Sequence, residues 1–189
     1  KRKLAIADNI KMLEEASELE IPLLVLVPGA DPSQSLDVSR DQIKQGIETI
    51  LPHAEKYNIK LAVEPLHPMF ADTRSAITSL KQANEMVENL NSDRLGIAID
   101  VYHLWFDDDL ENQIKRCGEN NNLYAFHICD WNVPTVDMLN DRGLMGEGCI
   151  DLKKIRGWVE EAGFDGFNEV EIFSTKFWES DQIEFLNKI

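Results

Sequence analysis

The strongest constraint on the fold is an alternation of short apolar runs with amphipathic helical segments along the chain. The apolar runs are nearly continuous, which is typical of parallel strands covered on both faces. Between them, apolar residues recur every three or four positions, which is the period of a helix with one buried side. The five apolar runs span residues 23–27, 61–63, 95–99, 123–128 and 167–173. Helices are predicted at the start of the chain, over residues 42–57, 74–90, 110–119 and 152–162, and from about residue 181.

Capping residues agree with several of these helix boundaries. Asp151 is placed to cap the helix that starts at residue 152, Gly163 to end it, and Ser180 to cap the final helix. Pro52 lies inside the 42–57 segment, where proline removes a backbone hydrogen bond and clashes with the preceding turn. We therefore expect that helix to kink or restart near Leu51.

Consecutive strand and helix units are compatible with two α/β architectures, an open doubly wound sheet and all or part of a TIM (β/α)8 barrel. A dinucleotide-binding sheet would show a GxGxxG turn after its first strand, but the first run here is followed by Pro-Gly-Ala-Asp-Pro at residues 28–32. In a barrel, functional groups lie at the C-terminal ends of the strands. The residues that close the apolar runs are therefore the candidates for a functional site.

Four successive runs each carry a possible metal ligand at or near the C-terminal end, namely Glu64, Asp100, His127 and Glu171. The intervals between them are long enough for a helical crossover between parallel neighbours, so these side chains are expected to converge. Taken singly, an acid here is as well explained by a helix cap and the histidine by a buried hydrogen bond. Their coincidence on four strands predicts a divalent metal site. Three carboxylates and one imidazole suit Mn²⁺ or Mg²⁺, with Co²⁺ and Zn²⁺ as alternatives.

The composition argues against several classes of partner. The chain has 34 Asp and Glu against 19 Lys and Arg, and the formal net charge of -15 repels phosphate backbones and anionic membranes. The longest apolar run, residues 21–27, is far shorter than the roughly 20 residues of a membrane helix. Three widely spaced cysteines, Cys117, Cys129 and Cys149, favour a reducing compartment. We expect a cytoplasmic protein that binds neither nucleic acid nor membranes.

Several motifs together resemble a known family. They are EPLHP at 64–68, DVYH at 100–103, HICDW at 127–131, DRGLMGEGCID at 141–151 and EVEIFS at 169–174. In this order they are similar to the sugar phosphate isomerase/epimerase family of xylose isomerase-like TIM barrels. The resemblance extends over essentially the whole chain.

The resemblance implies a role for each motif residue. The four strand-end residues would be the metal ligands, and Glu64 and Glu171 would also move a proton between the two faces of a ketose through a metal-stabilised enediolate. His103 and Arg142 would contact the sugar, and His67 lies just beyond a strand end where it could line the pocket. Glu169 competes with Glu171, because residues two apart on a strand point to the same face. The family position favours Glu171. The implied enzyme is a sugar or sugar phosphate isomerase or epimerase with a small-molecule sugar as its partner.

Three other functions stay open. A keto-sugar or keto-inositol dehydratase would use the same metal and end in loss of water. An apurinic endonuclease of the same superfamily would carry Asp-Arg-His where this chain has Asp141-Arg142-Gly143, and the negative charge disfavours DNA. A non-catalytic metal- or sugar-binding scaffold would not need an acid/base pair at Glu64 and Glu171.

The chain accounts for only part of the family's barrel. A TIM barrel has eight strands and typically about 250 residues, whereas the five runs here correspond to strands four to eight. We expect residues 1–189 to form a single barrel domain, the C-terminal five βα units, with its N-terminal part missing. An unpaired sheet edge needs a partner chain or a covering helix, so a homo-oligomer is a further expectation.

Overall fold

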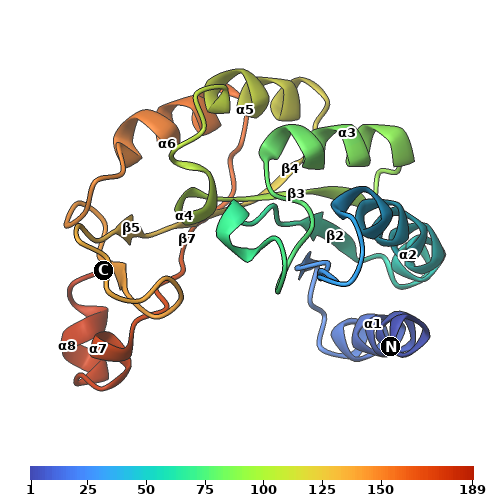
Figure 1. Ribbon diagram of the computed structural model, residues 1–189, viewed down its shortest axis with the longest axis horizontal. Helices are drawn as coiled ribbons and strands as arrows, with labels where there is room; N and C mark the ends of the chain where they lie inside the picture. Colours follow the sequence, from blue (N-terminus) through green and yellow to red (C-terminus); the bar gives the residue numbers. More distant parts are fainter.

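The computed structural model describes residues 1–189 and consists of a curved parallel sheet with helices along its outer face (Figure 1). The strand order is β1-β2-β3-β4-β7, and every neighbouring pair is parallel. The strands are β1 Leu23–Leu26, β2 Lys60–Val63, β3 Leu95–Asp100, β4 Leu123–Ile128 and β7 Asn168–Val170. Because β1 and β7 each pair on one side only, the sheet is an open arc of a barrel.

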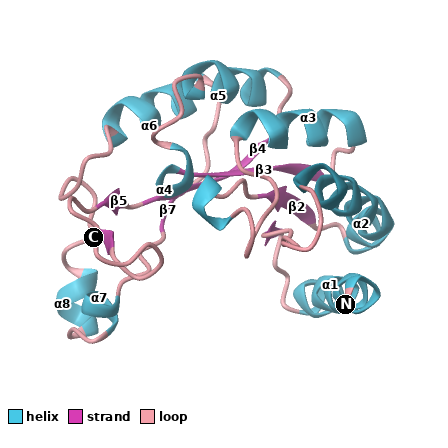
Figure 2. Ribbon diagram, in the orientation of Figure 1, coloured by secondary structure: helices cyan, strands magenta, loops and turns pink.

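Four of the longer helices cover the outer face of this arc. Helices α2, α3, α5 and α6 lie in sequence along the sheet, and α1 packs against α2 at one end (Figures 1 and 2). The helices are α1 Arg2–Glu18, α2 Leu36–Tyr57, η1 Pro68–Phe70, α3 Leu80–Leu90, α4 Val101–Leu104, α5 Leu110–Glu119, α6 Leu152–Glu161, α7 Thr175–Trp178 and α8 Gln182–Leu186. None of them is both long and apolar enough to cross a membrane.

Three of the helix predictions differ from the structure. Helix α2 begins at Leu36 rather than residue 42, because the Ser35 hydroxyl accepts from the Val38 amide and caps the helix there. Helix α2 runs unbroken through Pro52, so the restart expected near Leu51 is wrong. Helix α3 begins at Leu80 rather than residue 74, because the Ser79 hydroxyl accepts a hydrogen bond from the Gln82 amide and caps the helix there. Residues 74–79 therefore lie before the helix, and of these Arg74 lines the cavity described below.

The capping predictions for α6 and α8 have mixed outcomes. The Asp151 carboxylate caps α6 through the Lys154 amide, as predicted, and Gly163 follows the end of that helix with a φ of 89°. Helix α8 is capped by Asp181, whose carboxylate accepts from two backbone amides, so the assignment to Ser180 is wrong by one residue.

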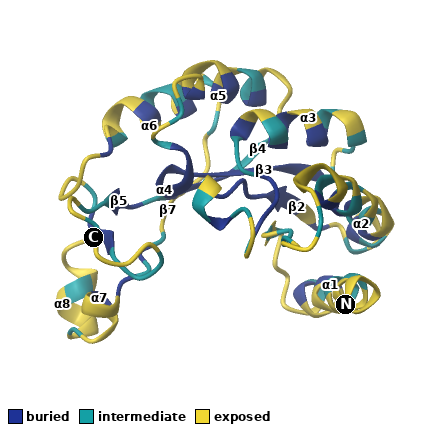
Figure 3. Ribbon diagram, viewed as in Figure 1, coloured by how far each residue is buried: buried dark blue, intermediate teal, exposed yellow.

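The main core lies between the sheet and its helices, where the buried parts of the ribbon are concentrated (Figure 3). Leu61, Ile97 and Phe126 are fully buried in this core, and each contributes roughly 1.5–3 kcal/mol by leaving water. On the inner face of the arc the strands instead carry the small side chains of Ala62 and Ala98. The outer core is therefore what holds the strands, and their C-terminal ends, in register.

A second, two-stranded sheet follows the C-terminal end of β4. Strand β5 (Asp130–Trp131) pairs antiparallel with β6 (Arg142–Gly143). The apolar pattern did not predict this ribbon. Its importance is positional, because it brings Arg142 back to the end of the main sheet.

Candidate metal and catalytic site

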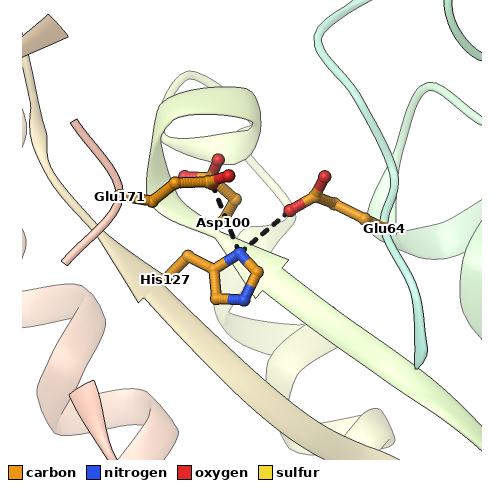
Figure 4. A group of neighbouring side chains, drawn as sticks. All are labelled: Glu64, Asp100, His127 and Glu171. Carbon is orange, nitrogen blue, oxygen red and sulfur yellow. Dashed lines mark hydrogen bonds and ion pairs between the residues drawn. The ribbon is translucent and has the colours of Figure 1, made fainter. Parts of the chain in front are cut away.

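Four side chains meet at the C-terminal edge of the sheet. Glu64 follows β2, Asp100 ends β3, His127 lies in β4 and Glu171 follows β7. Each offers one ligand atom, and these atoms all lie within 4.8 Å of one another (Figure 4). The structure thus brings together all four residues that the sequence singled out as ligands.

Strand register explains why these residues converge. Asp100 is the pairing partner of His127 across β3 and β4. The backbone amides of Glu64 and Glu171 each continue the sheet by one hydrogen bond, to Leu26 and Ile128 respectively, at 3.0 Å. The parallel arrangement therefore presents four consecutive strand ends at one level.

Glu169 and Glu171 both line the same cavity, as expected for residues two apart on a strand. Glu169 is exposed and pairs across the sheet with His127. Only Glu171 contributes an oxygen to the four-residue cluster. This geometry is consistent with choosing Glu171 as the ligand position.

His127 is the centre of the cluster. Its Nδ1 lies 3.0 Å from Glu64 Oε1 and 3.4 Å from Glu171 Oε2, and Figure 4 shows the two carboxylates approaching this atom from different strands. Burial opposes a charge on the ring, but hydrogen bonds to Glu171 and Glu64 outweigh it and raise the pKa of His127 to about 10.

Asp100 is fully buried. Its Oδ1 accepts from the Tyr102 amide at 2.9 Å and its Oδ2 from Arg142 Nη1 at 2.9 Å. Burial, reinforced by the charges of Glu64 and Glu171, raises the pKa of Asp100 to about 7 even though Arg142 acts in the opposite direction. The cluster carries more negative charge than its surroundings neutralise, which is the electrostatic condition for a cation site.

Arg142 contacts two carboxylates of the cluster, those of Asp100 and Glu171. Its Nη1 also lies 3.2 Å from Glu171 Oε2, and its guanidinium lies between the rings of Tyr102, at 4.4 Å, and Phe173, at 5.0 Å. Although burial raises the pKa of Glu171, the His127 hydrogen bond and the Arg142 charge outweigh it and lower that pKa to about 2. Glu171 is therefore ionised at neutral pH, as a proton acceptor must be.

His103 is buried beside Arg142. Its Nε2 lies 3.3 Å from Arg142 Nη2, and because arginine can only donate, this ring nitrogen accepts. Burial and then the charge of Arg142 lower the pKa of His103 to about 2, so the ring is neutral. His103 and Arg142 both line the cavity next to the cluster.

His67 lies apart from these residues. It does not line the cavity, and its Nδ1 accepts from the Met69 amide at 3.1 Å. The ring packs edge-on against Phe106 at 4.5 Å and near Trp131 at 5.5 Å. The structure therefore places His67 in an aromatic cluster beside the site.

The cavity over the cluster has a volume of about 430 Å³. Its lining combines apolar side chains, among them Val25 and Val27, with the charged and polar groups of the site. A larger hollow of about 700 Å³ lies between α1, β1 and α2 and contains none of the four cluster residues. The smaller cavity is the one that can bring a ligand to the cluster.

One residue of the cavity escaped the sequence analysis. Arg74 lines the cavity but fell within a predicted helix, so no signal marked it. Beside the site, the Asp130 carboxylate accepts from the amides of Trp131, Gly146 and Ile150, which anchors the loop after the β5–β6 ribbon.

Residues 1–189 match the family described as xylose isomerase-like TIM barrel. The chain belongs to the xylose isomerase-like TIM barrel family. The resemblance inferred from the motifs is thereby confirmed, and so is the fold class, with the five-stranded arc as the part of the barrel that this chain contains.

Three similar proteins place the chain within the xylose isomerase-like family. It is 25% identical over 175 residues to an inosose isomerase of Halalkalibacterium halodurans, covering 89% of this chain and 59% of that relative. It is 48% identical to the crystal structure of protein SMc04130 from Sinorhizobium meliloti, with a TM-score of 0.93 over 98% of this chain and 68% of that one. The IolI structure, which has a bound zinc atom, is 22% identical, with a TM-score of 0.82 over 97% of this chain and 65% of IolI.

The chain spans 59% of the length of the inosose isomerase that it matches. Other similar proteins include a probable endonuclease 4 of Mesomycoplasma hyopneumoniae, 27% identical over 78% of this chain and 54% of that relative. A divalent metal fits the residues present, because three carboxylate oxygens and an imidazole nitrogen, which are ligands that such ions accept, all lie within 4.8 Å of one another.

Proposed function

We propose that this chain carries the active site of a divalent-metal-dependent sugar isomerase or epimerase that moves a proton on a ketose. The carrying observation is the cluster of Glu64, Asp100, His127 and Glu171, whose ligand atoms lie within 4.8 Å of one another at the floor of a cavity. The donor set favours Mn²⁺, with Mg²⁺, Co²⁺ or Zn²⁺ as alternatives. The similarity to an inosose isomerase supports the reaction class.

Each residue has a distinct part in this proposal. When bound, the divalent cation supplies a Lewis acid that polarises the sugar carbonyl. Glu171 is ionised and accepts a proton from the carbon next to that carbonyl, and Glu64 returns a proton at the other face. Arg142 and neutral His103, which line the cavity, hydrogen-bond the sugar oxygens and hold the reacting carbon between the two glutamates.

Asp100 and Arg142 make the arrangement rigid. Asp100 is held by the Tyr102 amide and by Arg142, and Arg142 in turn contacts Glu171. A carboxylate that accepts a proton is effective only within hydrogen-bond reach of the carbon acid, so its position matters as much as its pKa. The aromatic rings on either side of Arg142 restrict its motion.

The test is deuterium incorporation from D₂O into a panel of ketoses in the presence of Mn²⁺. We expect Glu171→Gln to lower exchange by at least about 100-fold, because general base catalysis typically contributes 10²–10⁴-fold. Glu169→Gln is the matched control, since Glu169 lines the same cavity two residues away but lies outside the cluster. It should retain exchange within a few-fold of the unmodified protein.

Metal binding is measured in parallel by calorimetry. Glu171→Gln should reduce turnover by more than it weakens Mn²⁺ binding, because the same carboxylate has an acid/base role as well as a ligand role. Equal turnover of Glu171→Gln and the unmodified protein would reject that role. Loss of water from the sugar would reassign the site to a dehydratase, and no deuterium uptake with any ketose would favour a binding scaffold.

A further inference from the structure

Arg74 is the one arginine of this chain whose side chain forms neither a hydrogen bond nor an ion pair. The other six, Arg2, Arg40, Arg94, Arg116, Arg142 and Arg156, each bond a carboxylate, an amide oxygen or a backbone carbonyl. Arg74 nevertheless lines the cavity that holds the metal-ligand cluster. In a chain with 34 acidic residues, a partly buried guanidinium without a carboxylate partner is unusual.

The backbone that carries Arg74 is firmly anchored. The Arg74 amide donates to the Phe70 carbonyl at 2.9 Å, and the Ala76 amide donates to the Gly29 carbonyl at 3.0 Å, which ties this loop to the end of β1. Ser75 and Ile77 are fully buried and are bonded to each other through the Ser75 hydroxyl. The side chain of Arg74 therefore extends from a fixed point at the cavity wall.

An aromatic ring supports the guanidinium without using its donors. The carbon at the centre of the Arg74 guanidinium lies 5.4 Å from the centroid of the Phe70 ring, which in turn packs edge-on against His103 at 5.8 Å. A cation–π contact uses the face of the guanidinium and leaves its N–H groups at the rim free. Glu169 lines the same cavity but forms no ion pair with Arg74. The donors are therefore available to a ligand.

We propose that Arg74 binds an anionic group of the substrate, so that the sugar handled by this site carries a phosphate or a carboxylate at a carbon away from the reacting one. The inference rests on the proposed function, in which a ketose occupies this cavity. Phosphate and carboxylate each present a pair of acceptor oxygens that a guanidinium recognises with two parallel hydrogen bonds. An anion bound at Arg74 would pair with the partly desolvated guanidinium. It would also hold the far end of the sugar and so orient the sugar toward Glu64 and Glu171.

The experiment compares three ketoses with a common carbon skeleton: D-fructose, D-fructose 6-phosphate and D-fructuronate. Binding of each to the full chain is measured by calorimetry with and without Mn²⁺, separately from deuterium exchange. The unmodified protein should bind at least one anionic ketose more tightly than D-fructose. Arg74→Gln should weaken that binding by about 10- to 100-fold, the loss of one charge-assisted hydrogen-bonded pair, and leave D-fructose within about twofold.

Two further variants control the interpretation. Arg74→Lys keeps the charge but not the fork, and should retain part of the preference for the anion. Arg156→Gln removes the same charge at an exposed site on α6 and should change nothing. If Arg74→Gln does not fold, inorganic phosphate provides a second measurement, because it should displace D-fructose 6-phosphate from the unmodified protein.

The outcomes separate this inference from the proposed function. If D-fructose exchanges deuterium and the anionic ketoses bind no better, or if Arg74→Gln weakens all three ketoses equally, the anion site is wrong and the isomerase proposal stands. If D-fructose 6-phosphate is the tighter anionic ketose and inorganic phosphate fails to displace it, the anion site is also wrong. If none of the three ketoses binds or exchanges, the anion site is rejected for this skeleton, and the isomerase proposal is decided by deuterium exchange with the wider ketose panel. The tighter of the two anionic ketoses identifies whether the group is phosphate or carboxylate.

Discussion

Replacing Asp130 by Asn tests whether the loop next to the site is held by one buried carboxylate. Asp130 is fully buried and accepts three backbone hydrogen bonds, from Trp131 at 2.8 Å, Gly146 at 2.9 Å and Ile150 at 3.0 Å. The bonds from Trp131 and Ile150 go to Oδ1, and the bond from Gly146 goes to Oδ2. Asparagine keeps the shape but has only one oxygen, so at least one backbone N–H faces an NH₂ group that cannot accept.

The expected change in the free energy of unfolding follows from the number of hydrogen bonds that Asp130 accepts. A hydrogen bond to a charged group contributes about 1.5–3 kcal/mol, and the bonds that remain weaken because the acceptor becomes neutral. We therefore expect Asp130→Asn to lower the free energy of unfolding by about 2–4 kcal/mol. The loop has little room to adjust, because even a Cβ at Gly148 would overlap the Trp131 carbonyl and the Asp130 carboxylate.

The assay is urea unfolding followed by tryptophan fluorescence. Asp137→Asn is the matched control, because the Asp137 carboxylate also accepts two backbone hydrogen bonds, from Leu139 and Asn140, each at 2.8 Å, but is exposed. Water can replace those bonds, so this variant should unfold at nearly the same urea concentration as the unmodified protein. The reasoning is refuted if Asp130→Asn is as stable as the unmodified protein, or if Asp137→Asn loses as much stability.

Two other predictions follow from the site and the core. Mn²⁺ at about 100 times its Kd should stabilise the fold by about 2.7 kcal/mol; chelation with EDTA should reverse the gain, and the gain should be lost in Glu64→Gln. A thiol reagent at pH 8 should label Cys149, which is exposed, and spare Cys117 and Cys129 until urea is added. Burial raises the pKa of Cys117 to about 12, so less thiolate forms at pH 8 and its reaction slows, whereas labelling of two or more thiols in the folded protein would contradict the buried placement.

The local pattern of apolar residues was sufficient to predict the helices and strands whose periodicity is long and uninterrupted. Helix α5 spans the predicted residues, and β4 coincides with its apolar run, because burial of a whole face imposes the period directly on the sequence. The meeting of Asp100 with His127 also followed from local information, since parallel neighbours joined by helices end at the same edge. Such residues need only the strand order and direction to be brought together.

Other features depend on contacts between segments that no local pattern records. The β5–β6 ribbon consists of two-residue strands, too short to show a period, and it exists because Trp131 and Arg142 pair across a loop. Arg74 lies in a loop because Ser79 caps the next helix and because the Ala76 amide bonds to Gly29. Helix propensity alone is compatible with a helix over residues 74–79.

The amino-acid sequence by itself determined the alternation of strands and helices and the four ligand positions at the strand ends, because burial and chain direction act on every residue in turn. Only the tertiary structure decided which further groups surround those positions. Arg142 reaches the cavity from β6 and Arg74 from the loop before α3, and their environment depends on hydrogen bonds and charges contributed by residues distant along the chain. Long-range electrostatics and loop packing have no period, and so the sequence pattern carries no signal for them.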